Sequence, residues 1–62
     1  MTVNYFAKNI KNFTATAITY IVRWNGAEEV FTNLNDLTFF WGAEEIKKYW
    51  MLNTREMVID IA

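Results

Sequence analysis

The sequence predicts a single α+β domain over residues 1–62, in which a β-meander of three strands precedes one helix packed on the sheet and a C-terminal strand (βββαβ). Two observations lead to this prediction. First, an Asn-Gly dipeptide at 25–26 separates two segments of alternating polarity. Second, the run Gly-Ala-Glu-Glu occurs twice, at 26–29 and 42–45, and only the first copy follows an asparagine. The two copies therefore predict different structures, a hairpin turn and the first turn of a helix.

The first strand is expected at residues 3–7, where apolar residues alternate, and a polar turn is expected at 8–12. Residues 13–24 are strand-like throughout, but their apolar positions change from one face to the other near Ala17 and Ile18. A regular strand cannot bury both sets of residues on one side, so the pattern predicts a bulge or bend there.

The hairpin is predicted from the Asn-Gly dipeptide at 25–26, because both central residues of a type I′ turn need a positive φ. A two-residue turn at this position fixes the register of the flanking strands. It places Arg23 opposite Glu28 and Tyr20 opposite Phe31, and both are favourable cross-strand pairs. The turn and the pairing both indicate the same hairpin.

The helix is predicted at residues 43–52, where apolar residues recur at the spacing of one helical face. Its start has two alternatives. The helix could begin at Leu37, or it could begin at Ala43 because Gly42 inside a helix costs about 1 kcal/mol relative to alanine. Asn53 is expected to end the helix in a left-handed conformation.

Residues 33–36 are expected to end the hairpin and to supply a helix cap, and residues 57–61 are expected to form the closing strand. A right-handed crossover would place this strand parallel to the first, giving the order 3-2-1-4. Asp60 is expected on the open face or at an edge, because an unpaired carboxylate is costly to bury.

The composition argues against several classes of function. The chain has no cysteine and no histidine, so disulfides, thiolate metal sites and the commonest acid/base side chain are missing, and no cofactor or metal is expected. A net charge of −1, a pI near 5.1 and six scattered basic residues disfavour binding to the phosphate backbone of nucleic acids. Without a membrane-length apolar stretch or a signal-peptide pattern, a cytoplasmic protein is expected.

Catalysis would therefore depend on carboxylates. The adjacent pairs at 28–29 and 44–45 do not make a ready acid/base dyad, because neighbouring residues point to opposite faces of a strand or diverge by about 100° on a helix. We expect these glutamates to be solvated charges. The sequence predicts no catalytic residue and no enzyme.

The aromatic residues carry the functional prediction, because they make up 18% of a chain too short to bury all of them. Exposed aromatic side chains are typical of protein interfaces. The predicted partner-binding residues are three aromatics with a carboxylate rim: Trp41, Tyr49, Trp50, Glu28 and Glu29. The partner is expected to be a protein, and a second copy of the chain in a homodimer is one such partner.

The leading hypothesis is a small non-enzymatic protein-binding domain, in one version an acidic inhibitor or adaptor of a larger cellular machine, of the kind that mobile elements encode. A homo-oligomeric structural protein is one alternative. The other is a nucleic-acid-binding module that stacks bases on the hairpin face formed by Tyr20, Val22, Trp24 and Phe31. Glu29 shares that face and only Arg23 in the hairpin is basic, so the hairpin lacks the several basic side chains that such a site uses to bind phosphates.

Overall fold

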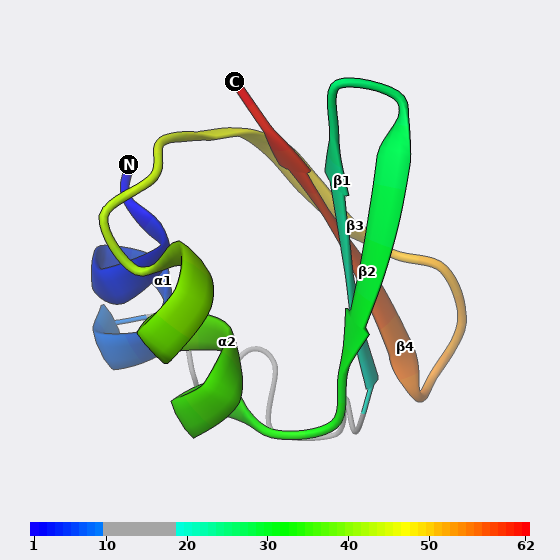
Figure 1. Cartoon of the computed structure of the whole chain (residues 1–62). Helices are drawn as coiled ribbons and strands as arrows, with labels where there is room; N and C mark the ends of the chain where they lie inside the picture. The colour runs from blue at the N-terminus through cyan, green and yellow to red at the C-terminus, as the bar shows by residue number, and fades with distance from the viewer. Residues whose placement is uncertain (10–18) are drawn as a thin grey trace.

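The computed structural model describes residues 1–9 and 19–62, and in this part of the chain a four-stranded sheet carries two helices on one face (Figure 1). The elements in chain order are α1 (Val3–Asn9), β1 (Thr19–Trp24), β2 (Ala27–Phe31), α2 (Leu34–Trp41), β3 (Ile46–Met51) and β4 (Glu56–Ile61). The strand order is β2-β1-β4-β3. The central strands β1 and β4 run parallel, and each pairs with an antiparallel edge strand. The α+β class is confirmed.

The β1–β2 hairpin has the predicted turn and register. Asn25 has a φ of 51° and Gly26 a φ of 82°, as a type I′ turn requires. The strands pair with Arg23 opposite Glu28, as the turn length dictates. Local turn chemistry and cross-strand pairing therefore select the same structure here.

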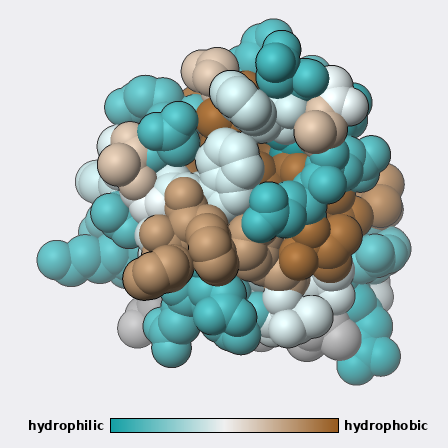
Figure 2. Space-filling model, in the orientation of Figure 1, coloured by the Kyte–Doolittle hydropathy of each residue, from teal (hydrophilic) through white to brown (hydrophobic). Residues whose placement is uncertain are grey.

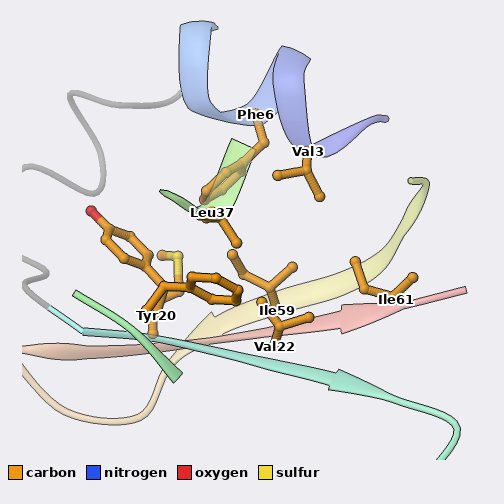
Figure 3. Packing of buried hydrophobic residues seen from close by; sticks show 9 residues of the cluster. Val3, Phe6, Tyr20, Val22, Leu37, Ile59 and Ile61 are labelled. Carbon is orange, nitrogen blue, oxygen red and sulfur yellow. The ribbon is translucent and has the colours of Figure 1, made fainter. Parts of the chain in front are cut away.

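The N-terminal segment is a helix, so the predicted strand at residues 3–7 is wrong. The Thr2 hydroxyl accepts a hydrogen bond from the Tyr5 N–H at 3.1 Å, which caps the first turn. Val3 and Phe6, three residues apart, are both fully buried, and Figure 3 shows them pointing from α1 toward the sheet. Helical spacing thus decides which residues are buried.

Two further predictions concern the same region. Of the turn predicted at 8–12, Lys8 and Asn9 belong to the end of α1 instead. The rest of that turn, and the bulge predicted near Ala17 and Ile18, lie outside the described residues.

The helix predicted at 43–52 is wrong, because this segment contains β3. A register shift between Ile46 and Lys48 interrupts the pairing of β3 with β4. The extra residue makes Ile46 and Tyr49, three apart, pair with the inward-facing Ile61 and Ile59. A bulged strand therefore imitates the spacing of a helical face. Three residues of the first Gly-Ala-Glu-Glu run belong to β2, and the second run leads into β3.

The helix α2 starts earlier than either predicted alternative. Asn33 caps it: its Oδ1 accepts from the Asp36 N–H at 2.8 Å, and its Nδ2 donates to Asp36 Oδ2 at 3.0 Å. The cap within 33–36 was predicted, but the helix follows it directly and ends at Trp41, with Gly42 as the C-cap. Neither Leu37 nor Ala43 is its first residue.

The closing strand was predicted at 57–61 and β4 spans Glu56–Ile61. It is parallel to β1 and pairs with it directly. The predicted order 3-2-1-4, in which residues 3–7 lay beside the closing strand, is therefore wrong. Asp60 lies on the face away from the helices, as expected, because it alternates with the buried Ile59 and Ile61. Asn53 does not have the predicted positive φ. Its side-chain Oδ1 accepts hydrogen bonds from the N–H groups of Arg55 and Glu56.

The core lies between the helices and one face of the sheet (Figure 3). Its buried residues are Val3, Phe6, Tyr20, Val22, Phe31, Leu37, Met57, Ile59 and Ile61. Each described strand except β3 contributes a fully or nearly fully buried side chain, and β3 contributes the partly buried Ile46, Tyr49 and Met51. The opposite face of the sheet carries no helix in the described part of the chain (Figure 1).

Candidate functional site

The helix α2 has one apolar stripe turned to the core and two exposed phenylalanines outside that stripe. Leu37 is fully buried, and Leu34 and Trp41 pack partly buried against the core. These three residues have the spacing of a single helical stripe. Phe39 and Phe40 fall outside that stripe and are 81% and 64% exposed. Neither ring belongs to the core of this domain.

The exposed rings are held in a defined arrangement by aromatic contacts. Phe39 and Phe40 meet edge to face, with ring centroids 5.0 Å apart. Phe40 also lies 6.0 Å from the buried Phe31 of β2. On the other side, Trp41 lies 6.0 Å from Trp24 at the end of β1. Such separations are favourable for aromatic pairs, so the cluster is partly preorganised.

We call the set Trp24, Phe39, Phe40 and Trp41 the aromatic surface. A cleft of about 260 Å³ opens beside its two tryptophans, between the C-terminal end of α2 and the β1–β2 hairpin. The cleft is lined by Val22, Trp24, Ala27, Glu28, Glu29 and Trp41. In the orientation of Figure 1, hydrophobic side chains gather over α2 (Figure 2). The aromatic surface thus consists of two ring pairs, Phe39 with Phe40 and Trp24 with Trp41, and exposed apolar side chains that gather in this way are typical of binding sites.

The charged residues of the cleft are both acidic. Glu28 and Glu29 line it, and no basic residue is among its lining residues in the described part of the chain. Glu29 pairs with Val22 and so faces α2, whereas Glu28 pairs with Arg23 and faces the open side of the sheet. A partner in the cleft therefore contacts the rings of Trp24 and Trp41 and lies near two negative charges.

Trp41 has a further polar feature. Its indole Nε1–H is buried and has no hydrogen-bond acceptor among the described residues. A buried donor without an acceptor costs about 1–3 kcal/mol. The position of Trp41 is thus determined by ring packing against Trp24 and the core, and not by a hydrogen bond.

The structure separates the five predicted site residues. Trp41, Glu28 and Glu29 come together at the cleft. Tyr49 lies on the core side of β3. Trp50 is on the opposite face of the sheet. The predicted aromatic cluster is therefore divided among three environments.

Two contacts locate the rings that are not at the cleft. The Tyr49 ring packs edge to face on Phe6, with centroids 4.9 Å apart, and links β3 to α1. The Trp50 ring lies beneath the Lys48 ammonium, 5.2 Å from the ring centroid. Neither arrangement brings these rings to the aromatic surface.

Three residues of the aromatic surface are not among the five predicted partner-binding residues: Trp24, Phe39 and Phe40. The stripe of Leu34, Leu37 and Trp41 is visible in the sequence and would have placed Phe39 and Phe40 outside the core. It was missed because the helix was expected further along the chain.

The hairpin face proposed for base stacking is mostly interior. Tyr20, Val22 and Phe31 are 4%, 1% and 6% exposed, whereas Trp24 is 46% exposed. Only one ring of that face is thus available to stack on a base.

Comparisons with known proteins add no relative. The chain matches no protein-family model, no curated protein and no solved structure. Within residues 1–9 and 19–62 there is no group of three or more carboxylate, histidine or cysteine side chains placed to hold a metal ion. No helix in those ranges is long and apolar enough to cross a membrane.

Proposed function

We propose that this chain is a non-enzymatic protein-binding domain that holds its partner on the aromatic surface. The observation that carries the proposal is the exposure of Phe39 and Phe40, 81% and 64%, on a helix that has a separate stripe for the core. Two adjacent phenylalanines in water contribute little to folding, whereas burying them against a partner is favourable at about 25 cal/mol per Å².

The chemistry of the surface suggests what the partner presents. The cleft beside Trp24 and Trp41 is large enough for one sizeable side chain. Its margin is negative because of Glu28 and Glu29. We therefore propose a partner segment with an aromatic or aliphatic side chain next to a lysine or arginine, since the basic residue would gain from the acidic margin.

Binding of this kind acts by occupation of a surface. A chain of 62 residues without histidine or cysteine has few catalytic side chains, but it can block or bridge surfaces of a larger assembly. The role proposed for the domain is accordingly that of an inhibitor or adaptor, and the acidic margin would favour basic sites on that assembly.

Selection from a library of displayed random peptides tests this proposal without knowledge of the natural partner. The folded domain serves as bait. We expect the enriched peptides to combine an aromatic or large aliphatic residue with a neighbouring lysine or arginine. Enrichment of peptides with no such combination would contradict the proposed recognition.

Variants of the bait locate the binding surface. Phe39→Ala and Trp24→Ala should each weaken the selected peptides by about 30-fold or more, because rings of this kind dominate interface energies. The matched control is Tyr5→Ala, which also removes an exposed ring, 56% exposed, but on α1. Equal binding by all three folded variants would place the binding site elsewhere.

A further inference from the structure

The face of the sheet away from the helices carries two ordered rows of side chains. The register of the three strand pairs defines them: Arg23 is opposite both Glu28 and Asp60, and Asp60 is opposite Lys48. One row across β2-β1-β4-β3 therefore reads Glu28, Arg23, Asp60, Lys48, with alternating sign. The adjacent row, two residues along each strand, reads Val30, Ile21, Val58, Trp50 and is entirely apolar.

These two rows form what we call the open face, and its apolar row is only partly covered. Val30 is 59% exposed, Ile21 and Trp50 are half-buried, and Val58 is 4% exposed at the centre. The charged row makes no direct ion pair within the described residues, where the N-terminal ammonium and Glu45 do pair at 2.7 Å. The four charges of the open face are thus not paired with one another, and the Lys48 ammonium lies over the Trp50 ring of the apolar row.

The order of charges makes the row complementary to its own reversal. Read from β2 to β3 the signs are negative, positive, negative, positive, and read from β3 to β2 they are the opposite at every position. A second copy turned about a two-fold axis parallel to the strands presents this reversed order. Glu28 then lies opposite Lys48 of the second copy, and Arg23 opposite Asp60.

The same rotation also superposes the apolar rows. A two-fold axis along the strands keeps each row at its own level, so Val30 meets Trp50 of the second copy and Ile21 meets Val58. A two-fold axis perpendicular to the strands would instead exchange the levels of the two rows. The charged residues of one copy would then lie on the apolar residues of the other. From this self-complementarity we infer that the open face binds a second copy of the chain, as a face-to-face β-sandwich with aligned strands.

The size of the face sets the strength of this dimer. Four strands about 4.8 Å apart and about six residues long give a face of roughly 400 Å², or about 800 Å² for two copies. Stable interfaces bury about 1,200 Å² or more in total, so the dimer is weak, with dissociation in the micromolar to millimolar range. The aromatic surface lies on the helix side of the sheet and stays free in it.

The experiment is sedimentation equilibrium of the full chain and two charge-reversal variants at about 50 mM salt, where screening of charges is limited. The parent should dimerise. Glu28→Lys and Lys48→Glu should each self-associate at least about tenfold more weakly, because each puts like charges opposite one another twice in the symmetric dimer. An equimolar mixture of the two variants should recover the association of the parent, since the lysine introduced in one variant then meets the glutamate introduced in the other.

The control is Lys8→Glu, which makes the same charge change as Lys48→Glu on an exposed position of α1. It should dimerise like the parent. Recovery in the mixture cannot arise from two misfolded variants, so it separates the interface from loss of folding. A parent that is monomeric up to millimolar concentration, or single variants that associate as tightly as the parent, would overturn the inference.

Discussion

Gly26 and Gly42 begin the same four-residue run, yet each is required for a different physical reason. Gly26 has a φ of 82° and a Cβ there would meet no atom, so only its backbone conformation demands glycine. Gly42 has an ordinary helical φ of −53°, but a Cβ would collide with the Thr38 carbonyl oxygen and the Asn4 side chain. One glycine supplies a turn and the other allows α1 and α2 to approach closely.

Replacement of Gly26 tests the turn. Gly26→Val should lower the free energy of unfolding by more than about 1 kcal/mol, because a β-branched residue is strained at positive φ. Gly26→Asn is the matched control and should cost much less, since asparagine tolerates this region. Urea denaturation measures both. Coinciding midpoints for Gly26→Val and the parent would refute the type I′ turn.

Replacement of Gly42 tests the close approach of the helices. Gly42→Ala should destabilise the domain by about 1–3 kcal/mol, because a backbone oxygen cannot move aside as easily as a side chain. In the interior of a continuous helix the same change would stabilise by about 1 kcal/mol. The sign of the change in the urea midpoint therefore distinguishes the two structures, and a stabilised variant would restore the long helix that the sequence first suggested.

At the scale of elements, the connection between α2 and β3 is tied to the N-terminus. The Ile46 N–H donates to the Met1 carbonyl at 2.7 Å, and the Asn4 N–H donates to the Gly42 carbonyl at 2.9 Å. The Met1 ammonium pairs with Glu45 at 2.7 Å. These bonds hold α1 over the start of β3, where the Tyr49 ring meets Phe6.

Tyrosine replacements test this docking of α1 on β3. Tyr49→Ala should lower the free energy of unfolding by about 3 kcal/mol or more, because it removes a ring packed against the buried Phe6. Tyr5→Ala makes the same chemical change at a ring that is 56% exposed and should cost less than about 0.5 kcal/mol. Thermal or urea unfolding compares them. Equal losses would show that β3 and α1 are not in contact.

The elements also show what local sequence can predict. The hairpin was predictable because turn residues and cross-strand pairs act over a few residues. The strand β3 was not, because the bulge at its start puts Ile46 and Tyr49 on one face at helical spacing. The helix α1 was missed because Val3, Tyr5 and Ala7 alternate, although Val3 and Phe6 are the pair that is buried. In both segments tertiary packing, and not the local pattern, decided the structure.

At the scale of the whole molecule, the sheet separates two surfaces with different chemistry. The helix side carries the aromatic surface with acidic residues at its margin, and the open face carries an apolar row beside a row of alternating charge. The carboxylate rim was predictable from the turn that positions Glu28 and Glu29. The exposure of Phe39 and Phe40 follows from the sequence only once the start of α2 is placed at Leu34, because that start decides which stripe the helix buries.

The central claim, that a protein partner is held on the aromatic surface, is tested most directly by the indole N–H signals of the three tryptophans in a ¹H–¹⁵N correlation spectrum. Trp24 and Trp41 lie at the aromatic surface, whereas Trp50 lies on the open face. Titration with a peptide selected on the domain should shift the Trp24 and Trp41 signals and leave that of Trp50 unchanged. A peptide that shifts Trp50 and neither of the other two would contradict the claim.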